Sequence, residues 1–319
     1  MSLYSLVRPL LFTIEPERAH NLGLWILDYG MRAKVASRPV TTSFGELGNP
    51  VGAPAGYDKT GNHVAALAKL GFGYIVAGTF TLQPYAGNPR PRVVRKVPEE
   101  AIVNSLGFPN PGIDAFTSNL SKAKAGVPVL ASISGRTIPD ILECYSRAQH
   151  HVAGIEVNIS SPNTPDLRDL REPAAFSELA HQLAATKKKP TYLKIPPYLN
   201  EAQFAVVVDL VRLWEGLGFE GVTASNTLPR DEPLLAVGKG GYSGPLLLDH
   251  TLSAIKALRK IVSERFEINA SGGITSASDV LRCIELGATT VQVFTALIYA
   301  GPGLIKSILV DLPAPTKGQ

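Results

Sequence analysis

The 319-residue sequence contains only two cysteines, Cys144 and Cys283, and no apolar run of the about 18 residues that a membrane-spanning helix needs. Two cysteines exclude a small scaffold held together by disulfides. A chain that is 45% hydrophobic and 18% charged does not have the composition of a disordered protein. No short apolar core followed by a small-residue cleavage site marks a signal peptide. We therefore expect an intracellular globular protein with reduced thiols.

The sequence also lacks a concentrated charge of one sign. The net charge is +4, and the densest basic run is Lys187-Lys188-Lys189, which precedes a candidate strand. Nucleic-acid binders usually carry a clustered basic stripe, so we expect no nucleic-acid partner. A solvated helix end is the simpler interpretation of this run.

The first forty residues form a separate N-terminal segment. Two apolar clusters, around Leu3–Phe12 and Leu22–Tyr29, predict two short amphipathic helices, and Arg18, Lys34 and Arg38 are among their basic flanks. These helices could simply cap the main domain, or they could lie on a membrane surface. The residues alone favour neither interpretation.

Beyond residue 40, apolar β-branched segments alternate with helical patterns. The expected strands are Val51–Tyr57, Tyr74–Phe80, Val127–Ser134, Gly154–Ser160, Pro190–Ile195, Gly221–Thr227, Phe266–Gly272 and Thr290–Ala296. Expected helices include Glu201–Leu217, Leu252–Arg265 and Ser276–Leu286. Eight such units predict an α/β fold of the (β/α)8 TIM barrel type over residues 41–312, followed by a tail at 313–319. An open doubly wound sheet is the weaker alternative.

Two long connections interrupt this alternation, at Leu82–Gly107 and at Leu228–Asp249. Long loops at the carboxyl end of a barrel are usually functional. We expect both to contribute to a site there.

Polar residues follow the expected strands at their carboxyl ends, where barrel enzymes hold their reacting groups. They include Lys59, Thr79, the run Asn158 to Thr164, Lys194, Ser225 to Thr227, Gly272, Gly273 and Thr295. Amides, hydroxyls and lysines predominate, with no carboxylate pair and no His or Cys cluster, so we expect no metal site. The set is suited to a planar, polar, anionic ligand.

Glycines indicate a phosphorylated cofactor. Gly240-Gly241-Tyr242-Ser243-Gly244 and Gly272-Gly273 each precede a predicted helix, and barrel phosphate sites favour the loops after strands seven and eight. No GxGxxG follows a strand and opens a helix, so a Rossmann dinucleotide site is not supported.

The residues resemble a known family over nearly the whole chain. The matching motifs are Pro16-Glu17-Arg18-Ala19-His20, Ala55-Gly56-Tyr57-Asp58-Lys59, Gly87-Asn88-Pro89-Arg90-Pro91-Arg92, Asn104-Ser105-Leu106-Gly107-Phe108 and Asn158-Ile159-Ser160-Ser161-Pro162-Asn163-Thr164. This pattern is similar to that of the dihydroorotate dehydrogenases, and within them to the quinone-using, membrane-associated class two. The resemblance implies an FMN cofactor, oxidation of (S)-dihydroorotate to orotate in pyrimidine biosynthesis, and a quinone acceptor. It also implies peripheral attachment to the cell membrane through the N-terminal helices.

The resemblance also implies a role for each matching residue. Ser161 would be the catalytic base. Substrate contacts would come from Lys59, Asn104, Gly107, Phe108, Asn158, Asn163, Asn226 and Thr227. Cofactor contacts would come from Ala55, Gly56, Lys59, Thr79, Asn104, Asn158, Lys194, Ser225, Gly244, Gly273, Phe294 and Thr295. His20 and Arg95 match positions at the family's quinone tunnel.

Some positions depart from the family pattern: Val76 for a glutamate, Asp166 for a glycine, Tyr198 as in class one, Phe294 for a tyrosine, and Ile298 for a position that is often polar. The last two fall where a quinone would approach. Two alternatives therefore stay open: another FMN oxidoreductase of the same barrel family with a different cyclic substrate or acceptor, and a non-enzymatic flavin- or phosphate-binding barrel.

Overall fold

The computed structural model describes residues 3–30, 32–160, 170 and 172–313. Eight parallel strands form a closed barrel, as expected from the alternating pattern. In order around the barrel they are β3 (Val51–Ala53), β4 (Tyr74–Phe80), β7 (Val129–Ile133), β8 (Gly154–Asn158), β9 (Thr191–Lys194), β10 (Gly221–Ala224), β13 (Glu267–Ser271) and β14 (Thr290–Gln292). The pairing of β14 with β3, Val291 with Val51, closes the ring.

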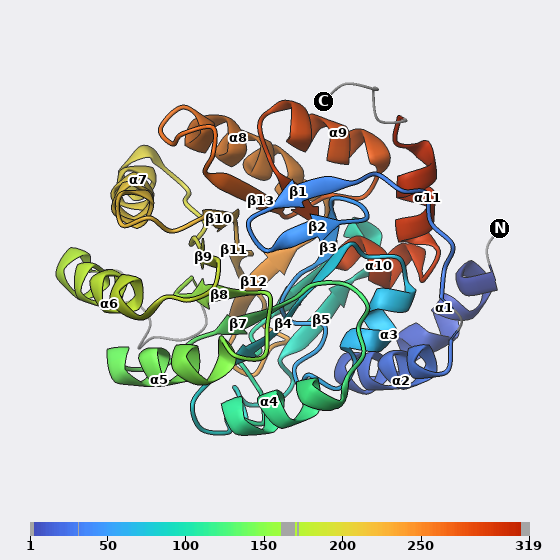
Figure 1. Ribbon diagram of the computed structural model, residues 1–319. Helices are drawn as coiled ribbons and strands as arrows, with labels where there is room; N and C mark the ends of the chain where they lie inside the picture. Colours follow the sequence, from blue (N-terminus) through green and yellow to red (C-terminus); the bar gives the residue numbers. More distant parts are fainter. Residues whose placement is uncertain (1–2, 31, 161–169, 171, 314–319) are drawn as a thin grey trace.

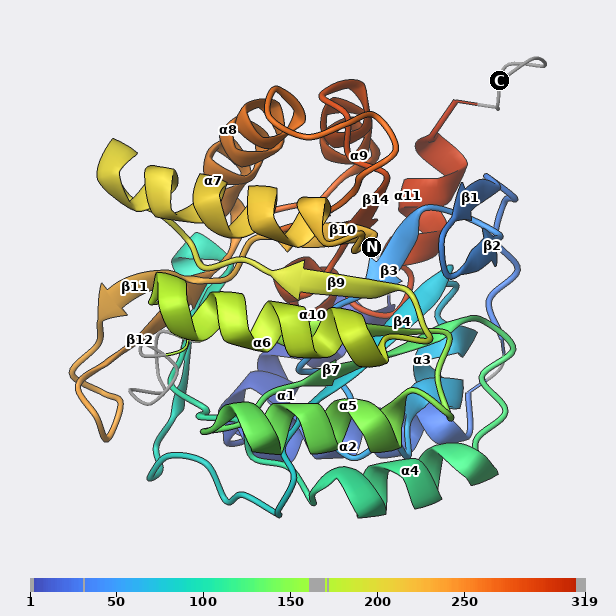
Figure 2. The ribbon, with the colours of Figure 1, turned by 60° about the vertical axis from the view of Figure 1, so that its left-hand side comes forward.

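Helices surround the barrel (Figures 1 and 2). They are α3 (Val64–Lys69), α4 (Ile113–Lys122), α5 (Ile138–Ala148), α6 (Pro173–Thr186), α7 (Glu201–Gly216), α8 (Leu248–Arg259), α9 (Ala277–Glu285), α10 (Thr295–Ala300) and α11 (Leu304–Asp311). Their buried faces pack on the outer side of the strands, around fully buried residues such as Trp214, Phe176 and Phe116. Apolar strands therefore alternate with amphipathic helices in the sequence because the helices cover the outer face of the barrel sheet.

A small hairpin covers the amino-terminal end of the barrel. Strands β1 (Val40–Thr42) and β2 (Gly45–Leu47) pair in antiparallel fashion, and Phe44 and Leu47 pack inside with Tyr74 and Tyr192. Val76, where the family usually has a glutamate, is buried in this apolar group.

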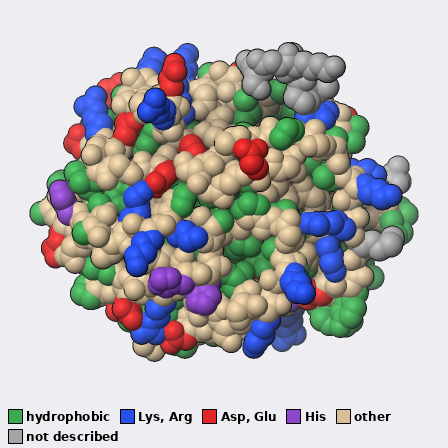
Figure 3. Space-filling view, viewed as in Figure 1, with side chains coloured by type: hydrophobic (Ala, Val, Ile, Leu, Met, Phe, Trp, Pro, Cys, Tyr) green, Lys and Arg blue, Asp and Glu red, His purple; other side chains and the backbone are tan. Residues whose placement is uncertain are grey.

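On the face seen in Figure 3, Lys and Arg side chains are interspersed with Asp and Glu side chains.

The two long connections form a second sheet that the sequence pattern did not predict. Strands β5 (Val93–Lys96) and β6 (Ala101–Asn104) come from the first connection, and β11 (Leu228–Asp231) and β12 (Lys239–Ser243) from the second. They join in the antiparallel order β11-β12-β6-β5, with Gly241 opposite Asn104. Figure 2 shows β11 and β12 at one end of the barrel, outside the ring of helices.

The N-terminal segment folds as two helices, α1 (Leu3–Thr13) and α2 (Pro16–Asp28). Helix α2 begins with Pro16 at its first turn, and the Glu15 carboxylate accepts hydrogen bonds from the backbone N–H groups of Glu17 and Arg18. The helices pack beside α3 and α10 (Figure 1). Much of their apolar surface stays exposed.

Several expected boundaries were wrong. The strand expected at Thr290–Ala296 ends at Gln292, and α10 starts at Thr295. The helix expected at Leu252–Arg265 begins at Leu248 and ends at Arg259, whose guanidinium binds the carbonyls of Ser263 and Phe266 in the turn that follows. Most of the other strands are shorter than expected at one or both ends.

Candidate active site

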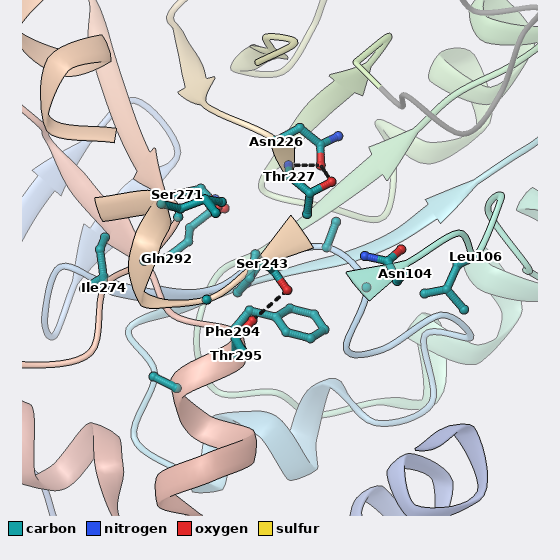
Figure 4. Close-up of a pocket in the computed structure, with 18 of the residues that line it drawn as sticks. Asn104, Leu106, Asn226, Thr227, Ser243, Ser271, Ile274, Gln292, Phe294 and Thr295 are labelled. Carbon is teal, nitrogen blue, oxygen red and sulfur yellow. Dashed lines mark hydrogen bonds between the residues drawn. The ribbon is translucent and has the colours of Figure 1, made fainter. Parts of the chain in front are cut away.

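A cavity of about 500 Å³ lies at the carboxyl ends of the barrel strands, beneath the second sheet. The predicted site residues that line it are Ala55, Gly56, Lys59, Thr79, Asn104, Gly107, Phe108, Asn158, Lys194, Ser225, Asn226, Thr227, Gly244, Gly273, Phe294 and Thr295. In Figure 4, Asn104, Asn226, Thr227, Ser243 and Phe294 are arranged around this space. The structure thus brings together residues that are separated by up to 240 positions in sequence.

Two predicted residues cannot be placed. Ser161 and Asn163 belong to the segment 161–169, which lies outside the described residues, and so does the departure at Asp166. Their roles stay predictions.

Side-chain amides at the rim are held by a buried hydrogen-bond network. Asn158 donates from Nδ2 to Thr79 Oγ1 at 3.0 Å, and its Oδ1 accepts from Ser160 Oγ at 2.8 Å. Asn226 donates from Nδ2 to the same Ser160 Oγ at 2.8 Å. Ser160 therefore links two predicted substrate-binding residues, Asn158 at the end of β8 and Asn226 after β10. Because these groups are fixed before any ligand arrives, less ordering is required on binding.

Two lysines supply positive charge to the cavity. Burial lowers the pKa of Lys59 to about 8, although the carboxylates of Glu17 and Asp58 oppose this shift. Lys194, at the end of β9, is 6% exposed and lies 4.0 Å from the carboxylate of Glu156. Such cations favour an anionic ligand.

Glycines line one end of the cavity, among them Gly244, Gly272 and Gly273. Gly273 has a φ of +74°, and a Cβ there would approach the Leu248 backbone nitrogen to 2.3 Å, so only glycine fits. Thr295 donates from Oγ1 to Ser243 Oγ at 2.9 Å across the cavity wall (Figure 4).

A flavin fits the residues that are present. The buried amide of Gln292 lines the cavity, and within the described residues neither its nitrogen nor its oxygen makes a hydrogen bond of normal geometry. An unpaired buried amide is costly, and a ring with C=O and N–H edges would satisfy it. Amides, two lysines and open glycine backbone form a suitable donor set for such a ring and its phosphate.

A second cavity of about 700 Å³ lies between the N-terminal helices and the barrel. It is mainly apolar, and both predicted residues, His20 and Arg95, line it. His20 donates from Nε2 to the carbonyl of Tyr57 at 2.8 Å, and burial, assisted by Lys59, lowers its pKa to about 3, so its ring is neutral. Arg95 donates to the carbonyls of Phe12 and Ile14.

The two cavities share a wall. Both cavities are lined by the same set of residues on this side: Lys59, Asn104, Leu106, Pro109, Ser243 and Phe294. The Phe294 ring stacks on Tyr57 at a centroid distance of 4.1 Å, and the Tyr57 hydroxyl donates to the Phe294 carbonyl. Phe294, which departs from the family pattern, is therefore part of this wall. Ile298, which also departs from it, lines only the second cavity.

Sequence reasoning missed Gln292, Ser243 and Ser271 as site residues. Gln292 and Ser271 are the last residues of β14 and β13, so their position at strand ends could have identified them. Ser243 lies on β12, which belongs to the second sheet that the sequence pattern did not predict.

Comparisons with known proteins agree with this arrangement. Residues 40–315 match the family model for dihydroorotate dehydrogenase. The chain is 37% identical to a dihydroorotate dehydrogenase (quinone) of Flavobacterium lutescens, over 99% of both chains. It is 34% identical to the one of Legionella pneumophila strain Corby, over 98% of this chain and all of that one. The structure is similar to that of the Eimeria tenella dihydroorotate dehydrogenase in complex with ferulenol, with a TM-score of 0.84 and 26% identity over 93% of this chain and 90% of that one.

Removing the Ser160 hydroxyl should loosen both amides that it joins. We expect Ser160→Ala to lower the free energy of unfolding by about 1–3 kcal/mol, because the half-buried Asn226 amide loses its acceptor and the buried Asn158 loses a donor. Urea denaturation measures this. The matched control is Ser121→Ala, an exposed serine on α4 that should change stability by less than about 0.5 kcal/mol. Equal effects of the two substitutions would contradict the role of Ser160.

Proposed function

Because the chain belongs to the dihydroorotate dehydrogenase family, we propose that it oxidises (S)-dihydroorotate to orotate with FMN in the first cavity and delivers the electrons to a quinone in the second. This is the redox step of pyrimidine (UMP) biosynthesis. The observation that carries the proposal is the shared wall, because Lys59, Asn104 and Phe294 face both cavities. A two-site redox enzyme needs its electron donor and acceptor to be close but separate.

Cofactor binding is assigned to the part of the first cavity that is lined by the ends of the barrel strands and by the glycines. Ala55, Gly56, Thr79, Lys194, Ser225, Gly244, Gly273, Phe294 and Thr295 would hold FMN, with Lys59, Asn104 and Asn158 between cofactor and substrate. When bound, the flavin supplies a two-electron acceptor for the hydride at C6 of dihydroorotate. Lys194 would stabilise the negative charge of the reduced ring.

Substrate binding is assigned to amides at or after the ends of the barrel strands and to Asn104 of the second sheet. The pyrimidine ring and carboxylate would be hydrogen-bonded by the side-chain amides of Asn104, Asn158, Asn163 and Asn226. Further contacts would come from Thr227, Gly107 and Lys59. Phe108 would cover the substrate and exclude water. Ser161 would take the proton from C5, a role that a hydroxyl can fill only in a dry and well-aligned site.

Quinone access is assigned to the second cavity. Its apolar lining suits a hydrophobic ring and tail, and the neutral His20 and the Arg95 guanidinium are the polar groups that would orient the ring. Residues 1–40 would place the cavity mouth at the membrane. No helix in the described part of the chain is long and apolar enough to cross a bilayer. Peripheral attachment on the cytoplasmic side of the cell membrane would need only the exposed apolar side chains of α1 and α2.

Flavin reduction by substrate tests the proposed chemistry. In the absence of air, dihydroorotate should bleach the yellow protein, and Ser161→Ala should slow this reduction by about 10²–10⁴-fold while FMN stays bound. Stopped-flow absorbance measures the rate, and the absorbance of released flavin measures the FMN content.

Ser121→Ala, on the exposed face of α4, is the matched control and should bleach at the wild-type rate. A yellow wild-type protein that does not bleach would contradict the proposed substrate. An unchanged rate in Ser161→Ala would remove that residue from its role. Fumarate or oxygen reoxidising the protein faster than quinone would favour the alternative acceptor that the departures at Phe294 and Ile298 leave open.

Membrane attachment should depend on apolar side chains that do not line the second cavity. Leu6, Leu10 and Trp25 are 64%, 71% and 56% exposed. Replacing all three by serine should weaken binding to phosphatidylethanolamine–phosphatidylglycerol vesicles at least tenfold, because each loses about 1.5–3 kcal/mol of apolar transfer free energy. Vesicle sedimentation measures the affinity.

Leu246→Ser is the control for this experiment, because Leu246 is 72% exposed but lies outside the N-terminal helices. Turnover of the triple variant with a short-chain quinone in the absence of vesicles should be unchanged. Wild-type protein that does not sediment with vesicles would show that α1 and α2 only cap the barrel.

A further inference from the structure

A carboxylate lies inside the barrel directly below the cavity. Glu156 is on β8, two residues before Asn158, and is 1% exposed. Its Oε2 accepts a hydrogen bond from Thr223 Oγ1 at 2.8 Å, and its Oε1 has no hydrogen-bond partner among the described residues. The Lys194 ammonium lies 4.0 Å from Oε1.

Strand register places Lys194 between this carboxylate and the cavity. Lys194 on β9 is level with Asn158 on β8 and with Thr223 on β10, and Glu156 lies one step deeper, level with Tyr192. Lys194 lines the cavity and Glu156 does not. The lysine therefore faces the cavity on one side and a buried carboxylate on the other.

A second buried carboxylate shows what a purely structural arrangement looks like. Glu267, on β13, is 8% exposed and accepts hydrogen bonds from the Ser43 backbone N–H, the Ser43 hydroxyl and the Tyr192 hydroxyl, each at 2.6 Å. It lies at the amino-terminal end of the barrel, where neutral donors satisfy both oxygens. Glu156 has one neutral donor and a cation instead. A buried carboxylate with so few donors is costly unless a positive charge offsets it.

We propose that Glu156 is a positioning residue that fixes the Lys194 ammonium below the cavity and offsets part of its charge, and so keeps the reduction potential of the bound flavin low. This inference rests on the proposed function, since it needs a flavin above Lys194. A cation beside the flavin stabilises the negatively charged reduced form. A carboxylate behind that cation weakens the effect, because the two charges act on the ring with opposite sign. A lower potential would favour transfer of electrons onward to the quinone.

Glu156→Gln, which keeps the shape of the side chain and removes its charge, tests the proposal. The reduced flavin should become about tenfold more favoured, which raises the midpoint potential by about 30 mV for a two-electron couple. Reoxidation by quinone should be correspondingly slower. Reductive titration against a redox dye measures the potential without using the substrate.

Two further variants separate charge from structure. Glu156→Asp keeps the charge and should have a potential closer to wild type than Glu156→Gln has. Glu267→Gln, the matched control, should lower stability and leave the potential unchanged. An unchanged or lower potential in Glu156→Gln, or an equal shift in Glu267→Gln, would overturn the proposal.

A folding failure would also be informative. If Glu156→Gln does not fold, the double variant Glu156→Gln/Lys194→Met should recover folding, because neither buried charge is then left unpaired. A double variant as unstable as the single one would overturn the pairing. Wild-type protein that binds no flavin would contradict the proposed function itself. Flavin that binds and bleaches normally, with a potential insensitive to Glu156, would contradict only this inference.

Discussion

The backbone hydrogen bonds between β14 and β3 close the sheet into a ring, and the position of every rim residue depends on that closure. In a closed parallel barrel all strands end at the same rim, so residues from distant parts of the sequence meet there. Gly52, on β3, shows how tightly the barrel interior is packed, since a Cβ there would approach the ring of Tyr74 on β4 to 2.3 Å. Lys59, Asn158, Lys194 and Gln292 face one cavity for this reason.

The second constraint is the wall that divides the rim into two sites. The antiparallel sheet of β5, β6, β11 and β12 brings Asn104 and Ser243 over the barrel mouth, and the stacked rings of Tyr57 and Phe294 complete the partition. Helices α1 and α2 then enclose the far side. The two cavities differ in character because one is bordered by strand ends with polar side chains and the other by apolar helix faces.

Sequence patterns predicted the barrel because continuous apolar strands need a covering of helices, and eight strand–helix units in succession favour a closed barrel over an open sheet. The pattern missed the second sheet, because its strands, such as Lys239–Ser243, are short, glycine-rich or charged and partly exposed, so they lack a simple alternation. It extended most of the strands too far, as at Thr290–Ala296, because apolar residues continue into the turn and into α10. The family resemblance named most of the residues that line the first cavity, and the strand-end position of Gln292 was a signal that went unused. The partners of Glu156 depend instead on which way a side chain points inside the barrel. Periodicity within one strand does not specify such contacts between strands.

In the proposed enzyme, dihydroorotate and quinone occupy different cavities with one wall between them. Enzyme reduced in advance and saturated with orotate distinguishes this from a single shared site. We expect quinone to reoxidise its flavin at the same rate with and without orotate, as followed by stopped-flow absorbance. Competitive slowing of reoxidation by orotate would contradict the account, because it would place both molecules in one cavity.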